Sequence, residues 1–223
     1  MLVLGIDDAG RGPVIGPMVL AGVLVEEDVQ KKFKKIGVTD SKKLTPKRRE
    51  YLAEKIKGMI ETFEITVTHP EEIDGHIDGD TESNLNKLEA KKCAEIINKI
   101  NKGLGKLKVV IDCPSVSIAS WADYLKRNID NLSNLEISCE HKADKNHMSV
   151  AAASILAKSV REKEMALLKA QFGKKIGSGY CSDPLTCKFL EKYAQEHEDK
   201  GIFRKSWKTW KKACKNLGQR KLF

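Results

Sequence analysis

The sequence lacks the features that mark secreted and membrane-bound proteins. No apolar run approaches the roughly 18 residues that a membrane span needs. The apolar start has no basic leader, and Asp7 and Asp8 interrupt it too early for a signal peptide. The six cysteines form no Cys-x-x-Cys pair, which disfavours a zinc site. We therefore expect an intracellular, cytoplasmic protein with free thiols.

The chain also has too few acidic residues to balance its basic ones. Lysine and arginine number 40 against 31 aspartates and glutamates, so the formal net charge is +9. This excess favours a polyanionic partner, although a basic surface that only keeps the protein soluble explains it equally well. With 41% hydrophobic residues among 223, the chain can form one large domain, or a domain with a smaller appendage.

Apolar patterning predicts strands that alternate with helices. Strands are predicted at residues 2–6, 18–25, 63–68, 107–111 and 135–139. Helices are predicted from residue 46 onward, at residues 85–100, 118–126 and 149–168, and twice after residue 184. This order predicts an α/β domain at residues 1–183, followed by a helical region at residues 184–223.

Four aspartates lie next to predicted elements. Asp7 and Asp8 close the first strand, Asp112 closes the strand at 107–111, and Asp144 precedes the alanine-rich helix. Carboxylates gathered at the rim of a sheet repel one another, and Mg²⁺ or Mn²⁺ would relieve that repulsion. Two such ions can promote phosphodiester hydrolysis. A lone aspartate after a strand is more often a turn former or a helix cap, so both interpretations stay open for each residue alone.

Six motifs, in the same order, resemble those of the ribonuclease HII (type 2 ribonuclease H) family. They are IDDAGRGPVIGP, DSKKLTPKRR, NLNKLEA, VIDCP, KAD…SVAAASILAKSVRE and GSGYCSDP, and RKSW at residues 204–207 extends the match. One motif would be weak evidence, whereas six in order over residues 5–184 are specific. The resemblance implies a ribonuclease H-like mixed central sheet flanked by helices, with a C-terminal helical extension.

The resemblance also implies an activity. Members of this family hydrolyse the RNA strand of RNA–DNA hybrids and cut 5′ of ribonucleotides embedded in duplex DNA, leaving 3′-hydroxyl and 5′-phosphate ends. By the resemblance, Asp7, Asp8, Asp112 and Asp144 would hold two Mn²⁺ or Mg²⁺ ions. The chain departs from the family at Asp8, where a glutamate is usual. A carboxylate misplaced by about 1 Å can lower a rate on the order of 100-fold. A catalytically weakened hybrid-binding variant is therefore one alternative, and another ribonuclease H-like DNA endonuclease is a second.

Recognition of the ribose is expected from the glycine-rich loop GRGPVIGP, at residues 10–17, and from one tyrosine. In the family, Gly10, Arg11 and Gly12 contact the ribonucleotide through backbone groups, and glycine permits such a close approach. Tyr180 matches the tyrosine that contacts the sugar at the RNA-to-DNA junction; Cys181 replaces a frequent proline after it. Read without the family, the glycines suit a tight turn and Tyr180 suits a packing residue.

Basic residues supply further candidates for substrate binding. Ser41, Lys42 and Lys43 in the DSKKL block are candidate contacts, with the lysines directed at phosphates. Weaker candidates are Lys142, Lys145 and Arg161, while the histidines at 141 and 147 could transfer protons or serve structurally.

The C-terminal tail is strongly basic. Residues 199–223 contain nine lysines and arginines against the single acid Asp199, and a helix there would grip the duplex backbone. Trp207 and Trp210 would share the inner face of that helix. Gln219 and Leu222 resemble part of a sliding-clamp-binding motif without its aromatic pair, so a sliding clamp is an expected partner. By family resemblance the protein is expected to be a monomer.

Overall fold

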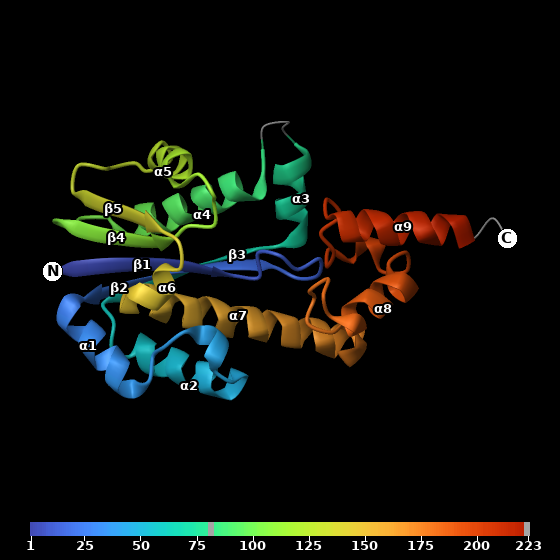
Figure 1. Ribbon diagram of the computed structural model, residues 1–223, viewed down its shortest axis with the longest axis horizontal. Helices are drawn as coiled ribbons and strands as arrows, with labels where there is room; N and C mark the ends of the chain where they lie inside the picture. The colour runs from blue at the N-terminus through green and yellow to red at the C-terminus, as the bar shows by residue number, and fades with distance from the viewer. Residues whose placement is uncertain (80–82, 221–223) are drawn as a thin grey trace. The chain divides into compact units, whose positions relative to one another are not determined.

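A mixed sheet forms the centre of the first of two compact units. The computed structural model describes residues 1–79 and 83–220, with side chains described up to residue 214 (Figure 1). The first unit comprises Met1–Ala9, Val19–Thr66 and Asn86–Val160. The second comprises Gly10–Met18, Val67–Leu85 and Arg161–Phe223.

The sheet has five strands in the order β3-β2-β1-β4-β5. Their bounds are β1 Leu2–Ala9, β2 Met18–Glu26, β3 Thr62–Thr68, β4 Leu107–Asp112 and β5 Leu135–Glu140. Strand β1 pairs antiparallel with β2 and parallel with β4, and β4 pairs parallel with β5. Residues 18–25 of β2 are all buried, as expected for a central strand covered on both faces.

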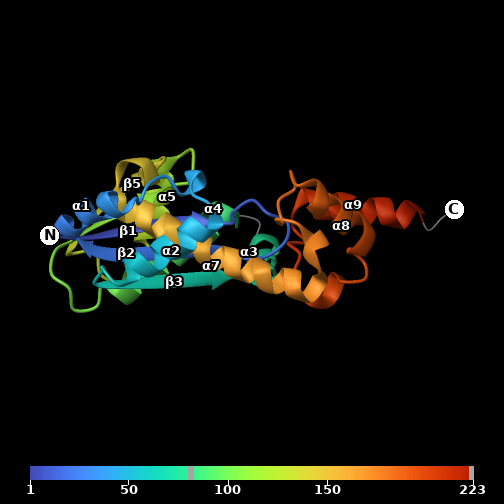
Figure 2. The ribbon, with the colours of Figure 1, turned by 90° about the horizontal axis from the view of Figure 1, so that it is seen from below.

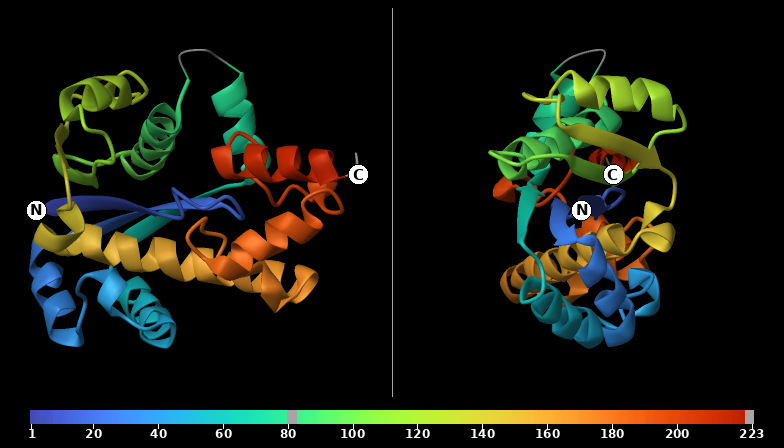
Figure 3. Two further views of the ribbon diagram at one scale, coloured as in Figure 1. Left: turned by 45° about the vertical axis from the view of Figure 1, so that its right-hand side comes forward. Right: turned by 90° about the vertical axis from the view of Figure 1, so that its left-hand side faces the viewer.

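Helices cover both faces of this sheet. Figures 1 and 3 show α4 (Leu85–Ile100) and α5 (Ile118–Lys126) on one face. The other face carries α1 (Glu27–Ile36), α2 (Pro46–Lys57) and the first part of α7 (Met148–Phe172), and Figure 2 shows α2 and α7 in front of the strands. Thr45 caps α2, accepting a hydrogen bond from the Arg48 N–H at 3.3 Å, and Pro46 occupies its first turn.

The start of α7 packs very closely on the central strand. A Cβ added to Gly5 of β1 would lie 2.3 Å from the carbonyl carbon of Ser149, which no side chain tolerates. Glycine in the strand and alanines in the helix therefore let the two backbones approach. This contact brings the short helix α6 (Ala143–Asn146), which precedes α7, to the sheet.

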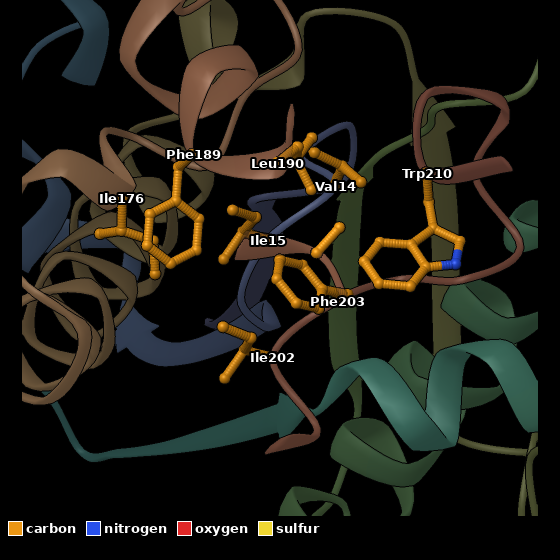
Figure 4. Packing of buried hydrophobic residues seen from close by; sticks show 9 residues of the cluster. Val14, Ile15, Ile176, Phe189, Leu190, Ile202, Phe203 and Trp210 are labelled. Atoms are coloured by element: carbon orange, nitrogen blue, oxygen red, sulfur yellow. The ribbon is translucent and has the colours of Figure 1, made fainter. Parts of the chain in front are cut away.

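The second unit has a separate core, shown in Figure 4. The second unit contains the helices α3 (Pro70–Asp78), α8 (Pro184–Tyr193) and α9 (Lys208–Arg220). The buried residues of this core are Val14, Ile15, Ile176, Phe189, Leu190, Ala194, Ile202, Phe203 and Trp210. The glycine-rich loop thus supplies part of this core, through Val14 and Ile15.

Backbone hydrogen bonds join three distant segments within the second unit. The N–H groups of Val14 and Ile15 donate to the Gly179 carbonyl at 2.9 and 3.2 Å. The Gly16 N–H donates to Ile202, and the Arg204 N–H donates to Val14. The segments at residues 10–18, 177–183 and 202–204 therefore form one packed assembly.

The mixed sheet, the flanking helices and the C-terminal helix confirm the predicted fold class. Three local expectations differ. Strand β1 continues through Asp7 and Asp8 to Ala9, so these aspartates lie inside the strand. Trp207 precedes α9, which begins at Lys208, so the two tryptophans do not share one helix. The structure also adds α1 and α3, which the apolar pattern did not predict. Within the described part of the chain, no helix has the length and apolarity to cross a membrane.

Candidate active site

Adjacent strands of the first unit position two of the predicted carboxylates. Ile6 of β1 is level with Ile111 of the parallel strand β4, so Asp7 and Asp112 follow at the same level of the sheet. The Asp7 side chain is only 6% exposed, and its Oδ1 accepts a 2.7 Å hydrogen bond from the Asp8 N–H.

Asp144 is joined to Asp112 through its neighbour in the chain. The Oδ1 atom of Asp112 accepts a 2.9 Å hydrogen bond from the Ala143 N–H, which ties the end of β4 to the helix α6. Asp144 lies in that helix and is 6% exposed. The bend before α6 requires a left-handed backbone at Lys142, with φ of 59°. Lys142 therefore shapes the turn that carries Asp144.

The four aspartates interact electrostatically. Burial raises the pKa of Asp7 well above its usual value, and the charges of Asp8 and Asp112 add to the rise, while hydrogen bonds from Ser154 and Asp8 oppose it. Burial also raises the pKa of Asp112, and the charge of Asp144 adds to that rise. The structure therefore brings the predicted carboxylates close enough for their negative charges to repel one another.

This donor set suits a hard divalent cation. It consists of carboxylate oxygens, and the repulsion among them is what a cation would relieve. Among the described residues, no three His, Cys, Asp or Glu side chains already stand in an arrangement that could hold an ion. The carboxylates are thus close enough to repel without forming a closed set of ligands.

A hydrogen-bonded network beside Asp7 was not predicted from the sequence. The Ser41 and Ser154 hydroxyls lie 2.8 Å apart, and the Lys158 ammonium donates to Ser41 and, at 3.1 Å, to Ser154. Burial lowers the pKa of Lys158, whereas the charge of Asp7 raises it. Lys158 therefore places a positive charge beside the carboxylates. Ser154 and Lys158 are four residues apart on α7, a spacing that could have suggested one shared face.

The DSKK block lies partly inside this network. Ser41 is fully buried, so its hydroxyl bonds within the protein. Lys42 and Lys43 are exposed, and Asp40 caps their short 3₁₀ helix by accepting a 3.0 Å hydrogen bond from the Lys42 N–H. The charge of Lys42 lowers the pKa of Asp112, so this lysine lies near the carboxylates.

The predicted ribose-recognition residues lie in the second unit, where Arg161 links them. A Cβ added to Gly10 would lie 2.1 Å from the Arg161 Nε atom, and Gly10 has a φ of 78°, so only glycine suits this position. The Arg161 guanidinium lies 5.0 Å from the centre of the Tyr180 ring. Arg161 also donates to the Ser178 carbonyl at 3.2 Å and is 8% exposed. It therefore supports Gly10 and Tyr180 from within.

Among the predicted ribose-recognition residues, Gly12 and Tyr180 are exposed to solvent. A Cβ added to Gly12 would meet no heavy atom of the described residues within 4 Å. The Tyr180 side chain is 40% exposed. Its loop is held by Asp183, whose carboxylate accepts a 2.7 Å hydrogen bond from the Ser178 N–H; hydrogen bonds to this backbone lower the pKa of Asp183.

Both histidines near Asp144 have protein partners. The His147 Nε2 atom lies 2.9 Å from Glu140 Oε2, and His141 Nδ1 lies 3.0 Å from the Cys113 carbonyl oxygen. These contacts fit the structural interpretation of both side chains.

Comparison with known proteins gives a match to a family model and several similar proteins of known structure. The model of the family described as Ribonuclease HII matches residues 4–210. The chain is 43% identical to the ribonuclease HII of Thermococcus onnurineus, covering 98% of this chain and 92% of that protein. The crystal structure of ribonuclease H2 from Pyrococcus horikoshii has a TM-score of 0.84 at 36% identity, covering 96% and 97% of the chains. The PCNA:RNase HII complex from Archaeoglobus fulgidus gives 0.80 at 37% identity, covering 93% and 94%.

Proposed function

Because the chain belongs to the ribonuclease HII family, whose members are endoribonucleases that cleave the RNA of RNA–DNA hybrids, we propose that it also excises ribonucleotides from DNA. Cleavage occurs on the 5′ side of a ribonucleotide embedded in duplex DNA and leaves 3′-hydroxyl and 5′-phosphate ends. The observation that carries the proposal is the set of mutually repelling carboxylates around Asp7 and Asp112. The proposed catalytic region is residues 1–183, which comprise the whole first unit and part of the second.

Asp7, Asp8, Asp112 and Asp144 are the residues that would hold Mn²⁺ or Mg²⁺. When bound, two such ions supply an activated water and stabilise the leaving oxygen in phosphodiester hydrolysis. The protein's own groups orient the carboxylates: Asp8 N–H and Ser154 bond to Asp7, and Ala143 N–H bonds to Asp112. Such fixed hydrogen bonds keep ligands oriented before an ion arrives.

Two lysines balance the charge of this site. Lys158 stabilises Asp7 from within the protein, through its charge and through Ser154. Lys42 is exposed near Asp112, where its charge can attract a substrate phosphate. Lys43, exposed beside it, extends the same basic surface. Ser41 acts indirectly, by holding Lys158.

The second unit recognises the ribose of the substrate. Gly10, Arg11 and Gly12 present backbone groups to the ribose, and the open space at Gly12 admits it. The 2′-hydroxyl is both donor and acceptor, which is how a protein distinguishes RNA from DNA at one position. The exposed ring of Tyr180 stacks on the following deoxyribose, where a 2′-hydroxyl would crowd it. This pairing accounts for a preference for RNA-to-DNA junctions.

The C-terminal region, residues 184–223, binds the duplex backbone and a sliding clamp. Three exposed lysines of α9 support the first role: Lys208, Lys211 and Lys212. The relative from Archaeoglobus fulgidus was solved as a complex with PCNA, which supports the second role. Leu222 of the clamp-binding sequence, and the side chain of Gln219, lie outside the described part of the chain.

The test compares three labelled duplexes, with and without Mn²⁺ or Mg²⁺. One is an RNA–DNA hybrid, one is DNA with a single ribonucleotide, and one is all DNA. We expect metal-dependent cleavage of the first two only, and loss of cleavage in the Asp112→Asn variant. Cleavage of the all-DNA duplex would instead identify a DNA endonuclease. Tight binding without metal-dependent cleavage would contradict the proposal and identify a hybrid-binding protein.

A further inference from the structure

Two side chains from residues 204–207 hold three consecutive carbonyl groups of the glycine-rich loop. The Arg204 guanidinium donates to Gly10 O at 2.6 Å and to Arg11 O at 2.8 Å. The Trp207 indole N–H donates to Gly12 O at 3.1 Å. All these residues belong to the second unit. The loop's carbonyl side is therefore fixed by a segment that lies about 190 residues away in the chain.

Fixing the carbonyl groups also fixes the N–H groups. A trans peptide is planar, with its C=O and N–H pointing in opposite directions, and no described peptide bond is cis. Because Arg204 holds the carbonyls of Gly10 and Arg11, the N–H groups of Arg11 and Gly12 point away from Arg204. The next residue is Pro13, which has no N–H, so the Trp207 bond orients the last peptide without directing a donor.

The buried arginine suits this task better than a lysine would. Arg204 is 0% exposed, and it also donates to Gly16 O from Nε at 3.1 Å and from Nη2 at 3.0 Å. A planar guanidinium can bridge several carbonyls at fixed angles, which a single ammonium cannot do. Its carbon lies 4.9 Å from the centre of the Trp207 ring, so the two side chains also support each other.

We propose that Arg204 and Trp207 are positioning residues for ribose discrimination. Arg204 holds the two peptides that carry the N–H groups of Arg11 and Gly12 in place for the 2′-hydroxyl, and Trp207 fixes the carbonyl end of Gly12, the residue that carries the second of these N–H groups. Both side chains act through the loop and do not touch the substrate. The inference rests on the proposed function, in which this loop reads the ribonucleotide. It deepens that function by assigning the specificity of the loop to the C-terminal RKSW segment.

A pair of matched tryptophan variants tests the proposal. Trp207→Phe removes the indole donor and keeps an aromatic ring beside Arg204. Trp210→Phe is the control, because Trp210 is buried and packs on Phe203 with ring centres 4.5 Å apart (Figure 4). The readout is the ratio of dissociation constants for an all-DNA duplex and the same duplex with one ribonucleotide, measured in EDTA so that neither is cleaved. Melting temperatures report stability separately.

We expect Trp207→Phe to lower this ratio by about three- to tenfold, the effect of one hydrogen bond, with the all-DNA affinity unchanged. Trp210→Phe should lower the melting temperature and leave the ratio unchanged. Arg204→Lys should lower the ratio further, and if it does not fold, the tryptophan pair still decides. An unchanged ratio in Trp207→Phe, or an equal fall in both tryptophan variants, would overturn the inference. A wild-type protein that binds both duplexes equally would instead remove the proposed recognition itself.

Discussion

Substitution by alanine should have different effects at two glycines of the glycine-rich loop: at Gly10 it should lower stability, and at Gly12 it should lower catalytic efficiency. At Gly10, φ is 78°, and a Cβ would lie 2.1 Å from Arg161 Nε and 2.7 Å from the Pro17 carbonyl oxygen. The left-handed backbone costs about 1–2 kcal/mol and the overlap about 1–3 kcal/mol. Gly10→Ala should thus lower the free energy of unfolding by about 2–5 kcal/mol, and the melting temperature by roughly 5–15 °C.

At Gly12, the added methyl group would meet no described atom within 4 Å, so Gly12→Ala should change stability by less than about 0.5 kcal/mol. Its effect should appear in catalysis, because the methyl group would occupy space that the sugar needs. A displacement of about 1 Å would lower kcat/KM on the order of 100-fold. Thermal unfolding and cleavage of a single-ribonucleotide duplex measure the two effects. Equal destabilisation by both substitutions, or full activity of Gly12→Ala, would refute this reasoning.

Three further outcomes follow from the carboxylates and the basic helix. Asp8→Glu restores the reach usual in the family and should raise kcat in Mn²⁺, by up to about 100-fold; an unchanged or lower kcat would show that Asp8 is not the limit. The raised pKa of Asp7 means that the folded state binds more protons than the unfolded state, so in EDTA its contribution to stability should fall as pH rises above about 4. Urea unfolding at several pH values should show that the free energy of unfolding falls with pH in the wild type and falls less in Asp7→Asn. The same dependence on pH in both proteins would contradict this prediction. Replacing Lys208, Lys211 and Lys212 by glutamine should weaken duplex binding. The slope of the logarithm of the binding constant against the logarithm of the salt concentration should fall in magnitude by about one for each phosphate that is no longer neutralised. An unchanged slope would exclude these lysines from the interface.

Periodic features of the fold were predictable from the sequence. The helices at residues 85–100 and 118–126 have the predicted bounds, because their apolar residues recur at helical spacing. Helix α1 was missed because its sequence is mostly charged and only Phe33 is buried. Strand β1 was predicted too short, since Asp7 and Asp8 are polar residues that the sheet nevertheless pairs with Ala21 and Leu20.

The polar contacts around the candidate site were harder to predict. Asp112 was expected at the end of an apolar strand, and Asp144 was expected just before the alanine-rich helix, in a motif that resembles the family. The partners of these groups were not predicted, because half-buried Lys158 bonds to Ser41, which lies 117 positions away in the chain, and helical spacing cannot reveal such a contact. Arg204 illustrates the same difficulty: its hydrogen bonds to Gly10 and Gly16 join residues 194 and 188 positions apart, and only the folded chain brings them together.

Mapping the cleavage position tests the proposed ribonucleotide excision most directly. A duplex with one ribonucleotide in a DNA strand would be cut in Mn²⁺ or Mg²⁺, and the product masses determined. We expect a single cut 5′ of the ribonucleotide, with a 3′-hydroxyl on one fragment and a 5′-phosphate on the other. A cut on the 3′ side with a 2′,3′-cyclic phosphate, which would mean attack by the 2′-hydroxyl and not by water, would contradict it.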